Sequence, residues 1–139
     1  MKLSWTAFGL LAIIAIAHYL GTIFDWYYYA DFFDEPMHLA GGAFIGMMFV
    51  YLFLERTSHA RLLPAWAYLL FGLGFIALVG IFWEFYEFLA DLFITHKYTL
   101  STFPSAVHVD TLKDLMNDLL GGAVGLLLAK KLARHPTTE

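Results

Sequence analysis

An apolar segment at the start of the chain, Leu3 to Phe24, constrains the fold most: it holds no charged residue and one histidine. As an α-helix its 22 residues would extend about 33 Å, enough to cross a hydrocarbon core of about 30 Å. The whole chain is 60% hydrophobic and 14% charged, whereas soluble domains average about 45–50% apolar and about 25% charged residues. We therefore expect an all-α membrane protein.

Three further apolar segments follow, so we expect four transmembrane helices in a single integral membrane domain, residues 1–139. The predicted helices cover about residues 3–24, 36–55, 63–94 and 110–132. Pro36 and Pro64 suit the first turn of their helices. Because the chain has no cysteine, disulfides, thiolate metal sites and thiol nucleophiles are excluded.

Most basic residues fall on one side of the membrane if the four segments cross alternately. The positive-inside rule makes that side cytoplasmic and predicts that both termini are inside. We therefore expect a multi-pass membrane protein, with most acidic residues at the outer ends of the helices, facing the exterior. The basic residues on the inner side are Lys2, Arg56, Arg61, Lys130, Lys131 and Arg134.

Ionisable residues recur at the outer ends of three predicted helices. Such residues are costly inside a bilayer and usually face a bundle interior or a wet cavity. Their spacing of three or four places the members of each motif on one helix face. The motifs are Asp34-x-x-x-His38, Glu84-x-x-Glu87 and Asp110-x-x-x-Asp114-x-x-x-Asp118.

Carboxylates and imidazole that converge from three helices suit a hard or borderline divalent metal ion. The alternatives are protonated or hydrogen-bonded carboxylates without a metal, and a purely structural polar plug. The predicted metal ligands are His38, Glu84, Asp114 and Asp118; the predicted proton-handling catalytic residues are Glu87 and Asp110; and the additional candidates are Asp34 and His108.

Glycines follow the polar motifs of the second and fourth helices, in Gly41-Gly42 and Gly121-Gly122. Small residues let membrane helices approach closely. Aligned on these pairs, the chain reads as two parallel two-helix repeats, although short glycine-rich stretches can also match by chance. If the repeat is real, pseudo-twofold packing places His38 opposite Asp118.

These motifs together resemble a known family. The pattern Asp34, His38 and Gly42, then Trp83-Glu84-Phe85-Tyr86-Glu87, then Asp110-Thr111-x-x-Asp114 with Asp118 and Gly121-Gly122, resembles the YjdF-like uncharacterised inner-membrane proteins. It is similar, more loosely, to the VanZ-like membrane family, although Asp118 stands where that family has asparagine and Glu87 where glutamine is common. The resemblance implies a small, multi-pass helical protein of the bacterial inner membrane, with a polar outer site that faces the periplasm or exterior, and it supplies no reaction.

Three function classes fit these observations. The first is an enzyme, a metal-dependent membrane hydrolase that acts on a lipid or lipid-linked substrate. The second is an ion or proton-coupled transporter that uses the same groups as a relay. The third is a non-catalytic accessory subunit of a larger membrane complex. Expected partners are membrane lipids, with homo-oligomers or a larger complex left open; the chain has no basic nucleic-acid-binding stripe.

Overall fold

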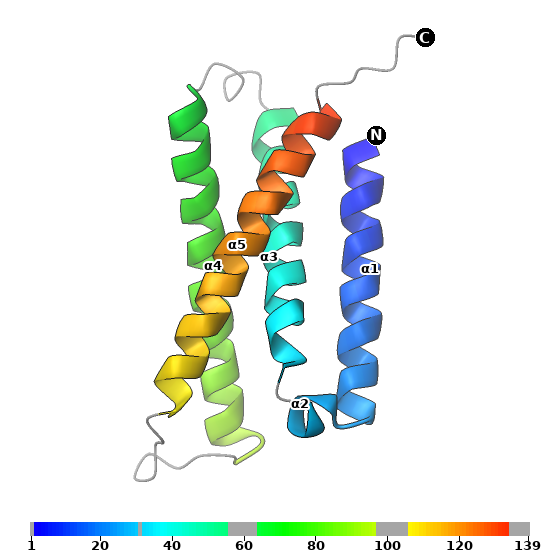
Figure 1. Cartoon of the computed structure of the whole chain (residues 1–139), viewed down its shortest axis with the longest axis vertical. Coiled ribbons are helices and arrows are strands. Elements are labelled where there is room, and N and C mark those ends of the chain that lie inside the picture. The colour runs from blue at the N-terminus through cyan, green and yellow to red at the C-terminus, as the bar shows by residue number, and fades with distance from the viewer. Residues whose placement is uncertain (1, 31, 56–63, 97–105, 134–139) are drawn as a thin grey trace.

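In a computed structural model of the chain, the residues that the structure describes (2–30, 32–55, 64–96 and 106–133) form helices and no strand. Helices α1 and α4 run in one direction along the bundle and α3 and α5 in the other, so that α1 begins and α5 ends at the same end (Figure 1). The elements are α1 (Lys2–Ile23), α2 (Trp26–Tyr29), α3 (Asp34–Phe49) continued by the π-helical segment η1 (Val50–Glu55), α4 (Ala65–Phe93) and α5 (Ala106–Ala133).

The four long helices lie close to their predicted ranges, with two differences. Helix α5 begins at Ala106 rather than near Asp110, so Asp110 lies inside the helix. The aromatic segment after the first helix forms a short helix of its own, α2. It follows Asp25, whose φ of 55° is left-handed and turns the chain sharply.

The prediction of four transmembrane helices needs correction. Within the described residues, three segments are long and apolar enough to cross a membrane: Leu3–Ile23, Asp34–Leu54 and Ala65–Phe93. Helix α5 is long, but its acidic first half and its basic last turn add charge that such a segment rarely tolerates. Which side of a membrane each end occupies stays a prediction.

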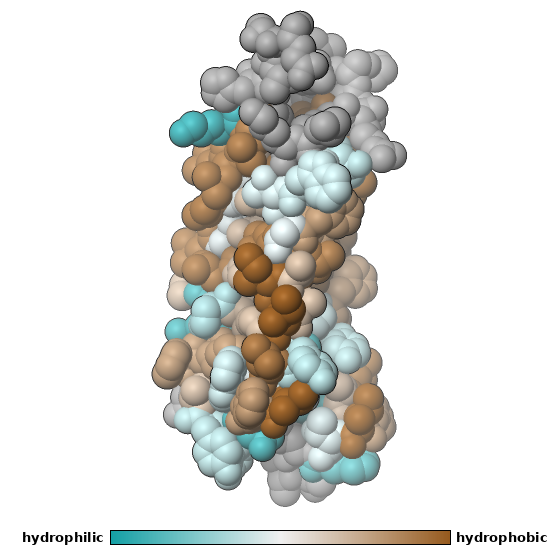
Figure 2. Space-filling view, turned by 90° about the vertical axis from the view of Figure 1, so that its right-hand side faces the viewer, coloured by the Kyte–Doolittle hydropathy of each residue, from teal (hydrophilic) through white to brown (hydrophobic). Residues whose placement is uncertain are grey.

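The outer surface of the bundle is largely apolar. On the side of the molecule seen in Figure 2, hydrophobic residues dominate and strongly hydrophilic ones are few. Large side chains such as Trp5, Ile13 and Tyr19 are more than half exposed. Only 11% of the most apolar part of α1 is buried against the rest of the chain. A surface of this kind is what a lipid environment requires, since water would penalise it.

Helices α3 and α5 make the most extensive contact in the bundle, and glycines permit it. A Cβ atom at Gly42 would overlap the backbone carbonyl of Asp118, and one at Gly121 would overlap the carbonyl of Leu39. One helical turn further on, the same exchange occurs between Gly46 and Gly122 and between Gly125 and Ala43. Each helix therefore places its glycines against the backbone of the other, as small-residue packing predicts.

The apolar core occupies the half of the bundle where α1 begins and α5 ends. Leu3, Val50, Ile76 and Leu126 are almost completely buried there. The hydroxyl of Tyr68 donates a hydrogen bond of 2.9 Å to the carbonyl oxygen of Leu126 and joins α4 to α5. This packing fixes the helices at one end, which leaves the opposite half free to hold polar groups.

Candidate metal centre

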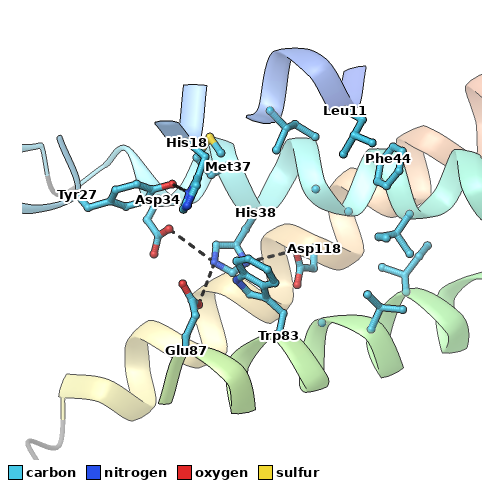
Figure 3. A pocket seen from close by; sticks show the side chains of 17 residues that line it. Leu11, His18, Tyr27, Asp34, Met37, His38, Phe44, Trp83, Glu87 and Asp118 are labelled. Carbon is cyan, nitrogen blue, oxygen red and sulfur yellow. Dashed lines mark hydrogen bonds and ion pairs between the residues drawn. The ribbon is translucent and has the colours of Figure 1, made fainter. Parts of the chain in front are cut away.

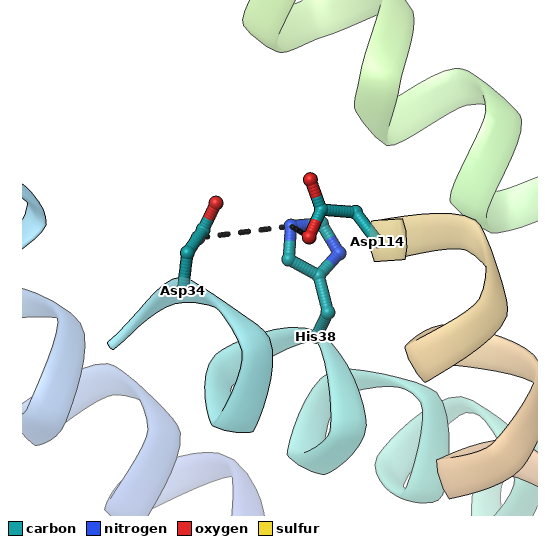
Figure 4. Close-up of side chains that lie close together, drawn as sticks. All are labelled: Asp34, His38 and Asp114. Carbon is teal, nitrogen blue, oxygen red and sulfur yellow. Dashed lines mark ion pairs between the residues drawn. The ribbon is translucent and has the colours of Figure 1, made fainter. Parts of the chain in front are cut away.

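His38 lies at the centre of a cluster of carboxylates from three helices. Its Nε2 atom is 3.7 Å from Asp34 Oδ1, 3.8 Å from Glu87 Oε2, 3.9 Å from Asp114 Oδ1 and 4.0 Å from Glu84 Oε1. Asp34 and Asp114 reach the ring from opposite sides (Figure 4), and Glu87 points to it from α4 (Figure 3). Four carboxylate oxygens therefore surround one ring nitrogen.

The other ring nitrogen of His38 faces a fifth carboxylate. Nδ1 lies 3.4 Å from Asp118 Oδ1. The predicted juxtaposition of His38 and Asp118 is thus present in the structure. Asp118 lies on a different edge of the ring from Asp34 and Glu87 (Figure 3), so it faces the ring nitrogen that those two carboxylates do not.

Helical spacing and glycine packing position these side chains. Asp34 and His38 are one turn apart on α3, as Asp114 and Asp118 are on α5, so each pair shares a face. Asp118 also fits against α4, because a Cβ atom at Gly80 would lie 2.6 Å from its Oδ2. The glycines at the helix contacts thus bring the carboxylates of α5 to the imidazole.

Burial within the cluster is graded. The side chains of His38, Asp114 and Asp118 are 4%, 6% and 10% exposed, whereas those of Asp34 and Glu87 are 33% and 39% exposed. The cluster is therefore closed on the α5 side and open toward Asp34 and Glu87. A reactant or ion would reach it from the open side.

The charge of the cluster is unbalanced. Five carboxylates face one imidazole, which carries at most one positive charge. Lys113, on the same helix as Asp114, is bound instead to Glu35 at 2.7 Å. Like charges at this separation in a low-dielectric setting are costly, so the cluster must take up protons or a cation.

The donor set fits a divalent ion. Two groups, Asp34–His38–Asp114 and His38–Glu84–Glu87, each offer ligand atoms within 4.8 Å of one another. Because such ions bind nitrogen and oxygen at about 2.0–2.6 Å, two ligand atoms on one ion lie roughly 3 to 5 Å apart. Glu84 Oε1 is also buried with no hydrogen-bond partner among the described residues. A buried acceptor of this kind is satisfied when it binds a cation.

The structure brings most of the predicted site residues together. Glu84 and Asp114, predicted ligands, and Asp34, an additional candidate, lie beside Nε2, as does Glu87, which was predicted to handle a proton. The catalytic and ligand roles themselves stay predictions. Two further candidates are exposed on the first turns of α5 and are not among the carboxylates and histidines grouped around His38: Asp110 and His108.

One polar pair next to the cluster was missed from the sequence. His18 Nδ1 and the Tyr27 hydroxyl lie 2.8 Å apart, with the rings edge to face at a centroid distance of 5.6 Å. Burial, with added repulsion from Asp34 and Glu87, raises the pKa of Tyr27 to about 12. From the sequence, His18 is expected to be a packed or hydrogen-bonded residue of the first helix and Tyr27 part of an interfacial aromatic segment, so no contact between the two is predicted. The indication that the sequence offers is that His18 is the one histidine in the uncharged segment from Leu3 to Phe24.

The fold and the cluster define a helical membrane protein with a buried histidine and carboxylate site. Residues 1–135 match the family described as predicted membrane protein (DUF2238), and the chain belongs to that family. This family is the YjdF-like one, so that resemblance is confirmed, whereas the looser likeness to the VanZ-like family finds no support. No curated protein and no solved structure matches the chain.

Proposed function

We propose that the His38 cluster binds a divalent metal ion and that the protein is a membrane-embedded hydrolase acting on a lipid or lipid-linked substrate. The observation that carries the proposal is the arrangement around Nε2 of His38, where four carboxylate oxygens lie 3.7 to 4.0 Å from one nitrogen. Hydrogen bonds alone would draw such groups to shorter distances. Spacing of this kind is typical of ligands that share an ion.

Within this proposal the residues have distinct roles. His38, Glu84 and Asp114 are the most buried groups around the ion, and Asp34 completes the set from the open side. Asp118, on Nδ1, orients the imidazole so that Nε2 directs its lone pair at the ion, as outer carboxylates do in many metal sites. Glu87 is the partly exposed carboxylate, suited to accept and return a proton at the substrate.

A divalent ion in this position would polarise an ester or phosphoryl oxygen and lower the pKa of a water molecule. The chain's own groups exclude bulk water on the buried side, where Asp114 and His38 lie, and leave access on the side of Asp34 and Glu87. Because the site is open on one side, we expect the substrate to enter from that side.

The charge pattern supports a location of the His38 cluster at the outer side of the membrane. Lys130 and Lys131 lie in the last turn of α5, at the end of the bundle opposite the His38 cluster (Figure 1). If that end is cytoplasmic, as the positive-inside rule predicts, the cluster lies at the outer side of a bacterial inner membrane. Substrates of the outer leaflet would then be within reach.

Metal analysis of the purified protein tests the proposal. Wild-type protein, dialysed against Mg²⁺, Mn²⁺, Ca²⁺ or Zn²⁺ in turn and then desalted, should retain about one ion per chain of at least one metal. His38→Ala and Asp114→Asn should lose it, while the control Asp110→Asn, an exposed acid of the same helix, should keep it. Absence of bound metal in the wild type, with folding unchanged in both site variants, would remove the metal site and favour an accessory subunit.

A further inference from the structure

A cavity of about 230 Å³ adjoins the cluster and is formed mainly by α1, α3 and α4, with Tyr27 of α2 and Asp118 of α5. One end is polar, where His18, Tyr27, Asp34 and Glu87 meet His38 (Figure 3). The other end is apolar and extends toward the middle of the bundle. Its wall there consists of Leu11, Ile14, Phe44, Ile45, Ile76 and Val79. A space with one polar and one apolar end has the shape of an amphiphile's binding site.

We place the entrance of the cavity between α1 and α4. Helix α1 packs on α3 and α5 and has hardly any contact with α4. The lining residues Leu11 and Trp83, one from each side of this gap, are 40% and 44% exposed. In a membrane this opening faces hydrocarbon chains, so an alkyl chain can enter without crossing water.

The volume limits what fits. About 230 Å³ lies below the roughly 300–1,000 Å³ of pockets that bind drug-sized ligands. A volume of this size favours one alkyl chain over two side by side. The apolar wall residues Leu11 and Ile14 share one face of α1 with His18 of the polar end, so a chain would lie along that helix toward the polar end.

The charge of the lining selects the head group. Asp34, Glu87 and Asp118 line the cavity, and no Lys or Arg is among its described lining residues. A divalent ion would neutralise two of the five carboxylates around His38. The remaining negative charge favours a cationic head group and opposes an anionic one.

We infer that this cavity is the substrate-binding site for a single-chain amphiphile whose amine head group is joined to the chain through a hydrolysable ester. The chain lies between α1 and α4, and the amine lies between the His18–Tyr27 pair and the carboxylates of Asp34 and Glu87. The inference rests on the proposed function, because it names the class of substrate for the His38 site.

Gly41 offers a direct way to close the cavity. It lines the cavity, and a Cβ atom added there meets nothing within 4 Å. Gly41→Leu therefore fills the space without a backbone clash. Gly74→Leu is the matched control, because Gly74 also has open space around its Cβ position but does not line the cavity.

Photolabelling measures occupancy in bilayers of zwitterionic phospholipid. The probes are three single-chain compounds that carry the same diazirine in the alkyl chain and end in an amine, an alcohol or a carboxylate. Mass spectrometry of peptides should place the amine label on residues of the cavity wall, including Leu11 and Phe44. Gly41→Leu should reduce that label by about tenfold, which corresponds to lost contact for about two methylene groups. Gly74→Leu should retain it.

The outcomes separate the inference from the proposed function when metal content is measured on the same samples. Cavity labelling that Gly41→Leu leaves unchanged overturns the chain site, and labelling by the carboxylate probe equal to that by the amine overturns the head-group assignment. Wild-type protein without metal but with amine labelling that Gly41→Leu abolishes supports the cavity and removes the metal proposal. Metal retained by Gly41→Leu while labelling is lost supports both.

Discussion

The Nδ1 atom of His38 lies 3.4 Å from Oδ1 of Asp118, on a different edge of the imidazole from the four carboxylates around Nε2. This contact joins α3 to α5 at the level where Gly42 packs against the backbone of Asp118. A carboxylate in this position fixes the orientation of the ring and holds a proton on Nδ1. The other nitrogen is then available to a cation.

Asp118→Asn tests that role. The amide keeps the size of the side chain but removes its charge, so the imidazole should be a weaker and less well oriented ligand. We expect affinity for the metal to fall about 10–100-fold, as for other outer-shell substitutions, while Asp114→Asn should abolish binding. Calorimetric titration of metal into the metal-free protein measures both. Equal losses in the two variants would make Asp118 a ligand rather than an orienting group.

Gly80→Ala should act on the site through Asp118. The added methyl group would lie 2.6 Å from Oδ2 of Asp118 and push the carboxylate away from α4. We expect weaker metal binding, with a loss smaller than that of Asp118→Asn, by the same titration. Gly74→Ala, on the same helix and with open space at its Cβ, is the control and should bind metal as the wild type does. No difference between the two variants would contradict the packing of Asp118 on Gly80.

Two adjacent glycines of α3 should respond oppositely to alanine. A Cβ at Gly42 overlaps the carbonyl of Asp118, whereas one at Gly41 meets nothing within 4 Å. Gly42→Ala should therefore destabilise the bundle by about 1–3 kcal/mol. Gly41→Ala should stabilise it by up to about 1 kcal/mol, because alanine favours helix. Unfolding in mixed detergent micelles measures both, and a destabilised Gly41→Ala would indicate a contact that the structure lacks.

Tyr27 should make stability depend on pH at the alkaline end. Burial and the charges of Asp34 and Glu87 raise its pKa from 10.0 to about 12. Because the folded state favours the protonated phenol, the contribution of Tyr27 to the stability of the fold is fully present below pH 10 and is lost as pH rises toward 12. The tyrosinate absorbance of the wild type and of Tyr27→Phe is measured against pH. The difference between the two titration curves is the ionisation of Tyr27 and should be centred near pH 12. A difference centred near pH 10 would mean that Asp34 and Glu87 do not act on the Tyr27 hydroxyl.

The sequence predicts the structure best where the side chains of a segment allow only one local conformation. The uncharged run from Leu3 to Phe24 predicted α1 within one residue at each end, because only a helix satisfies its backbone in an apolar setting. The spacing of Asp34 and His38 and the glycines that follow predicted the contact between α3 and α5. The start of α5 was predicted four residues late, since Asp110 is as suitable inside the first turns as before them.

For α5 the prediction of a membrane crossing is wrong, and the charge of the helix is the reason. The sequence predicts that Asp114 and Asp118 lie in a fourth membrane crossing, yet the charge of α5 leaves it outside the described segments that are apolar enough to cross by composition. The structure instead buries both acids against α3 and α4. Their burial depends on glycines in the other helices, Gly42 and Gly80, and pairing between helices is not encoded in the periodicity of one of them.

What the sequence alone determined is the class of protein and the set of polar residues at one end of the helices. Hydrophobic length and the cost of buried charge are local properties, so they can be evaluated from the order of residues. Only the tertiary structure decided that Asp34 and Glu87 share Nε2 with Glu84 and Asp114, and that Asp118 takes Nδ1. Likewise, the cavity beside the cluster depends on how α1 packs beside α3. These are distances between segments far apart in the chain, and packing sets them.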